Sequence, residues 1–450
     1  MDTAGYILGI VCGLLLYALF ARGLFIAVGP FLRERNSQIA LALLIAITIV
    51  KLALLRVLPG EPVDLSQFVR WGDALARFGP THIYEPRFLC NYTPAYFYAL
   101  WPAYALAPKN SESQRMFVEG ITVLGDFFLG LAAYGAVRRI ADVRLAIPTI
   151  LFLALNPAVI YTSTAWGQND SAIAFPVLLS VVVALDSRYA LAFAIAVVGA
   201  MVKAQGLILL PILAWWTLIN GDFKDWLKSA GAALATAVVV LAPFQLGHSW
   251  HFLIDVYSTS LGLFPWPSVN AFNLMLLLTG NTTVLDTDML IGSISYSMIG
   301  KTLFAATLAL AAWIMYRRRS AWDCLYGVFL VYFGMFLFVP RMHERYLYYA
   351  VALLAPLVFT SKTMMALYVT LSVTSLLDVA YVFFNLVQIP GWVEGHLLLG
   401  FGSREAISII NVAAFVVAAS YGIAIARRRP AASDSSVLVG PVHDGGVSVS

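Results

Sequence analysis

The chain has 450 residues, of which 61% are hydrophobic and only 12% are charged. Ordinary soluble domains have about 45–50% apolar and about 25% charged residues, so this composition excludes a soluble globular protein. The formal net charge of +4 is small, and the basic residues stand in short clusters at the ends of apolar blocks, which indicates membrane orientation rather than nucleic-acid binding.

The apolar residues come in blocks of about 20, the length that crosses a hydrocarbon core about 30 Å thick. These blocks predict an all-α polytopic membrane protein with about 11–13 transmembrane helices. We expect an extra N-terminal helix within residues 1–37, a transmembrane domain over 38–426, and a disordered cytoplasmic tail over 427–450. The apolar blocks are 4–29, 38–58, 92–107, 116–137, 145–163, 171–186, 189–218, 229–246, 296–316, 322–339, 346–360, 363–384 and 405–426.

Basic clusters orient the chain, because short cytoplasmic loops carry an excess of Lys and Arg. The clusters that belong on the cytoplasmic side are 32–36, 317–319 and 427–429. On the extracytoplasmic side of a cytoplasmic (inner) membrane this places the connections 59–91, 247–295, 340–345 and 385–404. We therefore expect polar motifs in these connections to face an external cavity.

Two apolar stretches do not fit this alternation as simple crossings. Residues 189–218 contain VGAMVKAQG, which places a lysine and a glutamine between two glycines near the middle of the stretch. A pair of broken helices that meet at Lys203 would satisfy the count, and freed backbone groups are tolerated where they line a cavity. The short, proline-containing segment 92–107 is expected to be re-entrant.

The first candidate element is PVDLSQFVRWGDALARFG, residues 62–79, in the first outer connection. Its aromatic and aliphatic residues share one helical face, which predicts an amphipathic helix lying in the membrane interface. Asp64 stands near its start, with Gln67 three residues later, so Asp64 can be the N-cap of a capping box. Asp64 can also be a general base at the membrane surface. The two interpretations are compatible, because a cap fixes where the carboxylate points.

A second group of polar residues lies at STAWGQNDSA and at the broken stretch that follows it. Trp166, Gln168 and Asp170 join two apolar segments without a longer loop, so they form either an interfacial turn or part of a pocket. Lys203, with Gln205 beside it, stands in the middle of an apolar stretch. A lysine there either snorkels to the interface or pairs with an anion, and the mid-segment position favours an anion.

The motif FVPRMHERYLYYAV, residues 338–351, concentrates charge between two apolar segments. Arg341 and Arg345 lie four residues apart, with His343 and Glu344 between them. An arginine presents a rigid fork that matches phosphate oxygens. The cluster is therefore either a phosphate site or an interfacial charge group that holds the register of the helices.

Other polar residues carry weaker signals. Asn270 and Asn273, in the long second outer connection, either hydrogen-bond a sugar or turn the chain. The three cysteines, Cys12, Cys90 and Cys324, show no metal-ligand spacing. They support neither a disulfide framework nor a zinc site.

Five motifs in order carry a family resemblance. AWGQNDSA, MVKAQGLILLP, PSVNAFNLM and RMHERYLYYA follow an outer loop that contains Asp64 and NYTPAYFYALWP. Over about residues 59–360 the chain resembles the polytopic C-type (GT-C) glycosyltransferases, especially the bacterial group related to the second GPI mannosyltransferase. The resemblance implies inverting transfer of a sugar from a polyprenyl-phosphate donor on the extracytoplasmic face. It also implies a catalytic carboxylate in the first outer loop, which by position is Asp64.

One further motif of the resemblance concerns the donor. HERY resembles the HEK motif of the dolichyl-phosphate-glucose-dependent glucosyltransferases, which implies a donor-site role for His343, Glu344 and Arg345. The chain departs from the family pattern in two places. NYTPAYFY has Thr and Ala where family members often have Pro-Pro-Gly, which bears on substrate geometry near Pro94, and an extra helix precedes the usual first one.

Inverting transfer needs a base on one side of the anomeric carbon and a stabilised leaving group on the other. We expect Asp64 to take the proton of the acceptor hydroxyl. Positive charge must stabilise the lipid phosphate that leaves. We expect that phosphate to be held by Arg345, Arg341, His343 and Lys203. We expect the substrate pocket to be lined by Glu344, Trp166, Gln168, Asp170, Gln205, Asn270 and Asn273.

The expected reaction moves a hexose to a lipid, glycan or protein acceptor of the cell envelope, and mannose is suggested only by the family resemblance. No paired acidic motif demands a metal, so we expect a metal-independent enzyme without a cofactor, in contact with membrane lipid and not with nucleic acid. The alternative is a transporter or flippase of a polyprenyl-linked or anionic substrate, because broken helices with charges at mid-depth are transporter features too. The charged motifs gather at one membrane face and no internal repeat is visible, which favours the enzyme.

Overall fold

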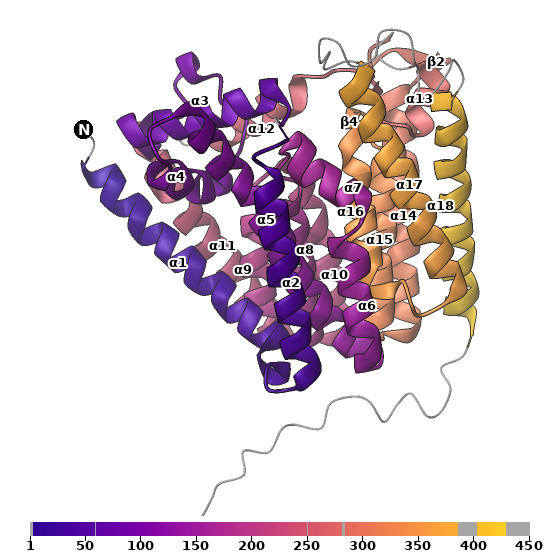
Figure 1. The fold of residues 1–450 in the computed structure, drawn as a ribbon. Coiled ribbons are helices and arrows are strands. Elements are labelled where there is room, and N and C mark those ends of the chain that lie inside the picture. Colours follow the sequence, from indigo (N-terminus) through magenta and orange to yellow (C-terminus); the bar gives the residue numbers. More distant parts are fainter. Residues whose placement is uncertain (1–2, 59, 250, 281–283, 386–402, 429–450) are drawn as a thin grey trace, which may run out of the picture.

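The computed structural model describes residues 3–58, 60–249, 251–280, 284–385 and 403–428. Nearly all of its regular structure is helical (Figure 1). The α-helices are α1 (Thr3–Val28), α2 (Arg35–Leu54), α3 (Pro62–Phe78), α4 (Phe97–Leu106), α5 (Ser111–Ile140), α6 (Ala146–Ala154), α7 (Pro157–Ile160), α8 (Ser171–Leu185), α9 (Tyr189–Ala200), α10 (Leu209–Asn220), α11 (Phe223–Gln245), α12 (Phe252–Gly262), α13 (Leu274–Thr279), α14 (Tyr296–Arg318), α15 (Ala321–Phe338), α16 (Leu347–Leu354), α17 (Lys362–Asn385) and α18 (Ser403–Arg427). The expected all-α polytopic membrane fold is confirmed.

Short helical turns and strands connect these helices. The turns are η1 (Gly29–Phe31), η2 (Pro80–His82), η3 (Pro86–Phe88), η4 (Pro94–Tyr96), η5 (Val143–Leu145), η6 (Tyr161–Trp166), η7 (Ala204–Ile208), η8 (Glu344–Tyr346) and η9 (Ala355–Leu357). All are 3₁₀-helical except η6, which is a π-helix. The strands are β1 (Ser268–Val269), β2 (Met289–Ile291), β3 (Ile294–Ser295) and β4 (Met342–His343). β1 pairs in parallel with β4, and β2 pairs antiparallel with β3.

Eight helices in the described segments are long and apolar enough to cross a membrane, and the bent pair Val143–Ala154 and Pro157–Trp166 makes a ninth if it counts as one span. Three shorter apolar helices lie beside them: Ser171–Leu185, Tyr189–Ala200 and Ala204–Asn220. The expected number of about 11–13 crossings included these shorter helices. They fall below the length of about 20 residues that crosses a bilayer straight.

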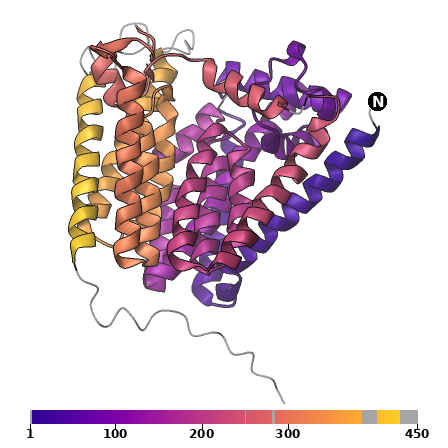
Figure 2. The same cartoon turned by 180° about the vertical axis from the view of Figure 1, so that it is seen from behind.

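The long helices run side by side, and the strands and most connecting turns gather at one end of the bundle (Figure 1). We call this the α3 end, because α3 lies across it. Helix α1 leans along the outside of the bundle and packs against α11, as the view from behind shows (Figure 2). Helix α15 is the most enclosed of the described spans, because 89% of the residues in its apolar stretch are buried. The expected tail from residue 429 and most of the connection 385–404 lie outside the described residues.

The stretch around Lys203 is broken, as its composition predicts. Helix α9 ends at Ala200, η7 follows, and α10 begins at Leu209. Gly206 allows the two helices to meet closely, because a Cβ at this position would lie 2.2 Å from the carbonyl oxygen of Gly199. Lys203 itself is extended, with φ −163° and ψ 153°. The break therefore places the lysine at the point where the chain reverses direction.

The amphipathic helix of the first connection is also present, but it begins earlier than the sequence suggests. Pro62 occupies its first turn and Glu61 is the N-cap, whose carboxylate accepts a hydrogen bond from the Asp64 backbone N–H at 2.6 Å. The prediction that Asp64 caps this helix is therefore wrong. The fixed φ of proline suits the first helical position, which moves the cap one residue before it. The expected partner in the box, Gln67, instead donates to the carbonyl of Phe88 at 3.2 Å.

Candidate active site

Asp64 presents its carboxylate to the turn that follows η6. Because Glu61 caps the helix, the Asp64 side chain is free to make contacts elsewhere. Its Oδ2 accepts a hydrogen bond from the Trp166 indole N–H at 3.1 Å and a second one from the Gln168 amide. The residue is half-buried. The two donors fix the orientation of the carboxylate.

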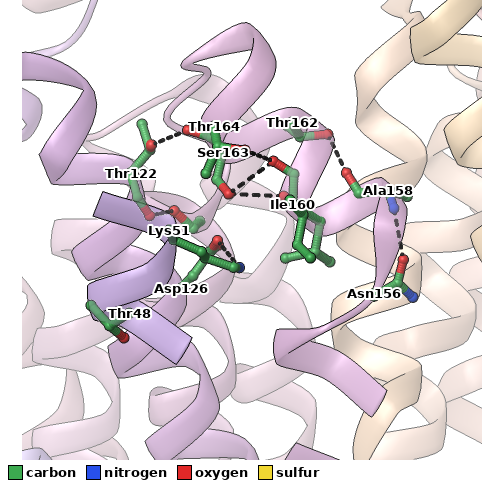
Figure 3. A network of polar contacts seen from close by, with 12 residues as sticks. Thr48, Lys51, Thr122, Asp126, Asn156, Ala158, Ile160, Thr162, Ser163 and Thr164 are labelled. Carbon is green, nitrogen blue, oxygen red and sulfur yellow. Dashed lines mark hydrogen bonds and ion pairs between the residues drawn. The ribbon is translucent and has the colours of Figure 1, made fainter. Parts of the chain in front are cut away.

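The π-helix η6 places Trp166 and Gln168 opposite Asp64. Its serine and threonine hydroxyls donate to backbone carbonyls of the preceding helix α7, and Thr122 of α5 donates to the carbonyl of Ser163 at 2.8 Å (Figure 3). The turn closes at Gly167, where φ is +81°. The backbone N–H of Glu61 then donates to the carbonyl of Trp166 at 2.9 Å, which ties the two segments together. Wide π-turns of this kind are frequent at functional sites.

A fully buried carboxylate, Asp170, lies between two cations. Lys203 Nζ is 3.6 Å from Asp170 Oδ1, and Arg345 Nε is 3.9 Å from Asp170 Oδ2. Tyr349 donates its hydroxyl to Asp170 Oδ1 at 2.5 Å. Both ion-pair distances exceed hydrogen-bond length, and neither Lys203 Nζ nor Arg345 Nε has a hydrogen-bond acceptor in the described part of the chain. Both cations are therefore able to bind a further acceptor.

Aromatic rings form the walls between these charges. Lys203 Nζ lies 5.2 Å from the ring centre of Tyr92 and 5.4 Å from that of Tyr346. The Arg345 guanidinium lies 5.8 Å from the ring of Trp166, whose N–H bonds to Asp64. Trp166 thus contacts the carboxylate on one side and the arginine on the other. This single side chain joins the Asp64 group to the Lys203 and Arg345 group.

Glu344 and His343 complete the cationic side. Arg345 binds Glu344 through an ion pair of 2.7 Å, and His343 Nδ1 lies 3.8 Å from the other Glu344 oxygen. Burial raises the pKa of the Glu344 carboxyl, but the charge of Arg345 and the contact with His343 lower it by more, to about 2. Burial holds the pKa of His343 below its ordinary value, so the imidazole is neutral at neutral pH. Glu344 therefore fixes the arginine, and His343 is a neutral hydrogen-bonding group.

The structure does not bring Arg341 into this group. Its guanidinium binds Asp286 at 2.8 and 3.1 Å and also donates to the carbonyl of Leu261. Its backbone φ is +68°, in the left-handed region, so the chain from Arg341 to Arg345 is not a continuous helix. In this arrangement Arg341 links Leu261 and Asp286 to the connection between α15 and α16.

The two asparagines and Gln205 have different surroundings. Asn273 caps α13 by accepting from the Leu276 N–H at 3.0 Å and donates to the carbonyl of Phe336 at 2.9 Å, so its amide is used within the fold. Asn270, with φ +62°, forms a bridge with His343 and so adjoins the site. The side-chain oxygen of Gln205 is buried and has no hydrogen-bond partner among the described residues.

Sequence reasoning missed several tyrosines and one asparagine of the site. Tyr92 donates to Asn169 Oδ1 at 3.3 Å, and both adjoin the groups above. Tyr346 and Tyr349 follow the charged motif directly. Aromatic residues near a membrane boundary are usually interfacial anchors, which concealed them. The signal that could have found them is the spacing of Tyr346 and Tyr349, which places both on the same helical face after Arg345.

Comparison with known families decides the protein class. The model of glycosyltransferase family 87 matches residues 90–340, more than half of the chain. The chain belongs to glycosyltransferase family 87. Among curated proteins, none matches the chain. A glycosyltransferase binds a sugar donor and an acceptor, so both are expected of this chain.

The family match covers one part of the site and leaves another part outside. Trp166, Asp170 and Lys203 lie within the matched residues, whereas Asp64 and Arg345 lie before and after them. Contacts in the structure connect these outer residues to the matched part: Trp166 bonds to Asp64, and Asp170 pairs with Arg345. The residues outside the match therefore belong to the same cluster as those within it.

Proposed function

We propose that the protein is an inverting glycosyltransferase that moves a hexose from a polyprenyl-phosphate donor to an acceptor on the extracytoplasmic face of the cytoplasmic membrane. The observation that carries this proposal is Trp166, which contacts the Asp64 carboxylate through its N–H and the Arg345 guanidinium through its ring. Trp166 therefore lies between a base and a phosphate-binding cation. This arrangement suits a direct displacement at the anomeric carbon, in which the base activates the acceptor and the cation stabilises the leaving phosphate. Mannose, as in the bacterial group related to the second GPI mannosyltransferase, is the first sugar to test.

In this mechanism Asp64 removes the proton from the acceptor hydroxyl as it attacks the anomeric carbon. The bond between that carbon and the phosphate oxygen breaks, and the lipid phosphate leaves with its electron pair. Lys203 and Arg345 bind the phosphate and stabilise its growing charge. His343, neutral in its buried position, is placed to donate a hydrogen bond. Arg341 is left out of this proposal, because Asp286 already occupies its guanidinium.

The remaining polar groups line the substrate pocket. Gln168 and Asp170 hold Asp64 and the two cations respectively, and Gln205 carries a buried oxygen that is able to accept from a sugar hydroxyl. The proposal assigns the neutralisation of the phosphate charge to the side chains of Lys203 and Arg345. Metal independence stays a prediction: transfer should continue in a chelator such as EDTA, and loss of transfer there would contradict it.

The test is sugar transfer by the full-length protein in lipid vesicles, with a panel of polyprenyl-phosphate hexoses and membrane lipid extract as the acceptor. Asp64→Asn should lower kcat by about 10²–10⁴-fold, the usual contribution of general base catalysis. Lys203→Gln should raise the donor KM by about 10- to 100-fold, since a hydrogen bond to a charged group contributes about 1.5–3 kcal/mol.

The matched control is Asp73→Asn, on the same helix as Asp64. Asp73 pairs with Arg77 at 2.8 Å, and Tyr104 donates to it at 3.0 Å, so it contacts none of the site groups. It should keep the wild-type kcat. Full transfer by Asp64→Asn would reject the general base, and lipid-linked sugar translocation without transfer would favour the flippase.

A further inference from the structure

Helix α5 carries a stripe of polar residues that the mechanism above does not use. Arg115, Glu119, Thr122 and Asp126 are spaced by four, three and four residues, so they lie on one face of the helix. They contact α2, the chain that leaves it, and the π-helix η6 with the turn after it. Thr122 binds the π-helix, and Asp126 binds Lys51 of α2 at 2.8 Å (Figure 3). The stripe therefore supports the α3 end of the fold from within α5.

Arg115 fastens the end of α2. Its guanidinium donates to the carbonyl of Leu55, the C-cap of α2, at 2.9 Å. It also donates at 3.1 Å to the carbonyl of Leu58, in the connection that follows the helix. The same guanidinium binds Glu119 Oε2 at 2.6 Å. Leu58 lies six residues before Asp64. Arg115 thus holds the chain at the point where it leaves α2 toward the proposed base.

Glu119 lies against the two turns that build the Asp64 site. A Cβ at Gly60 would be 2.2 Å from Glu119 Oε1, and a Cβ at Gly167 would be 3.1 Å from the same atom. Both glycines have left-handed φ, +70° and +81°. Gly60 precedes the Glu61 cap, and Gly167 lies between Trp166 and Gln168. The carboxylate of Glu119 therefore contacts the backbone of both segments that meet at Asp64.

We propose that Arg115 and Glu119 are positioning residues, which hold the Asp64 carboxylate against its Trp166 and Gln168 donors. This inference rests on the proposed function, because it treats Asp64 as the base. The two residues touch the segments that carry Asp64 and its donors, and none of their contacts reaches Lys203 or Arg345. They should therefore act on the chemical step and not on donor binding.

A role in fold stability alone is the competing explanation, because breaking any buried ion pair destabilises a protein. The two roles differ in where the effect appears. Loss of a purely structural pair lowers the melting temperature and the amount of active protein, and leaves kcat per active molecule unchanged. Loss of a positioning pair lowers kcat and leaves the donor KM close to its wild-type value.

The experiment compares Glu119→Gln and Arg115→Lys with wild type in the vesicle transfer assay, with active sites counted by donor binding. Glu119→Gln keeps the shape of the side chain and replaces its carboxyl group with an amide. We expect kcat to fall by about 10- to 100-fold, as small misplacements of a reacting group can cause, with donor KM changed less than about threefold. Arg115→Lys keeps the charge but loses the fork, so its kcat should fall less than that of Glu119→Gln.

The matched control is Arg138→Lys at the opposite end of the same helix. Arg138 likewise pairs with a carboxylate, that of Glu34, which it binds through both terminal nitrogens. Its side chain is 14% exposed against 21% for Arg115. It should lose melting temperature without losing kcat. If Glu119→Gln keeps kcat within about twofold of wild type, or loses kcat and donor affinity equally, the inference is wrong.

A second measurement does not depend on transfer. Hydrogen exchange in peptides covering residues 60–66 and 165–170 should become faster in Glu119→Gln, while peptides covering 203–209 and 343–347 should exchange as in wild type. Unchanged exchange in the first two peptides would overturn the inference even if no donor in the panel is used. Transfer that survives Asp64→Asn would reject the proposed base, whereas a normal Glu119→Gln beside an inactive Asp64→Asn would reject the positioning role alone.

Discussion

At the scale of single residues, the site depends on two kinds of buried charged side chain. Some are fully paired with other side chains, and others keep hydrogen-bond donors that a substrate could use. Asp170, which is fully buried, holds Lys203 and Arg345 at 3.6 and 3.9 Å. Taking a charge out of water is costly unless it is paired. Asp170 and Glu344 therefore make it possible for the two cations to be buried. The longer distances to Asp170 leave Lys203 Nζ and Arg345 Nε without a hydrogen-bond acceptor among the described residues.

Trp166 should matter through its N–H as well as its ring. Trp166→Phe keeps an aromatic face for Arg345 but removes the hydrogen bond to Asp64. We expect kcat to fall by about tenfold, in line with the loss of a hydrogen bond to a charged group, and donor KM to change little. Steady-state transfer kinetics measure both. A larger effect on donor KM than on kcat would show that the ring, and not the N–H, is the important part.

Glu344 predicts a pH dependence of stability. Its folded-state pKa is lowered from 4.5 to about 2, because the favourable charge of Arg345 and the contact with His343 outweigh burial. A lowered pKa contributes stability that is present above the unfolded pKa and is lost as the pH falls toward the folded pKa. Thermal unfolding of wild type and Glu344→Gln should therefore differ most at pH 7, and the difference should shrink below about pH 4.5. An equal difference at every pH would contradict the assignment.

At the scale of elements, breaks in regular helices build the site. The π-helix η6, the gap between α9 and α10, and the turn η8 carry Trp166, Lys203 and Arg345. Non-helical backbone at membrane depth is tolerated where it is buried in protein or lines a cavity. Each of these breaks has a polar residue that a continuous helix would direct elsewhere.

A substitution at Gly206 tests whether the close contact at the break between α9 and α10 is needed for the site. In Gly206→Ala the new Cβ would lie 2.2 Å from the Gly199 carbonyl oxygen, and backbone atoms cannot move away as a side chain can. We expect the two helices to separate, Lys203 to leave Asp170, and donor affinity and melting temperature to fall together. Gly231→Ala, where a Cβ has open space, is the control and should behave as wild type. Normal donor binding by Gly206→Ala would contradict the structural role of this contact.

The sequence predicts the helices, the break at Lys203 and the motifs of the site because these depend on composition and local spacing. Contacts between distant segments are less predictable. Arg341 shares a motif with Arg345, but its partner Asp286 comes from the long second connection. The cap of α3 is Glu61 and not Asp64, because Pro62 at the first position fixes the start of the helix. The contact of Glu119, on α5, with the left-handed turns at Gly60 and Gly167 joins distant segments, so only the three-dimensional structure reveals it.

At the scale of the whole molecule, contacts join the residues of the proposed reaction into one cluster, which includes Asp64 of α3, the helix that lies across one end of the bundle (Figure 1). Asp64 comes from the helix that lies across this end, and Arg345 comes from a turn almost 300 residues later. Family 87 membership covers the middle of the chain, and the contacts of Trp166 and Asp170 extend the site to both flanks. A single polar cluster at one end suits an enzyme that binds a lipid-linked donor and an acceptor from the same side.

The central claim is a direct displacement, with Asp64 as the base and the lipid phosphate as the leaving group. The most direct measurement is the anomeric configuration of the transferred sugar, determined by NMR for a polyprenyl-phosphate hexose of known configuration. The account predicts a product of the opposite configuration, because the acceptor attacks from the face away from the phosphate. A product that retains the configuration of the donor would require a covalent sugar intermediate or a different base, and would contradict the proposed mechanism.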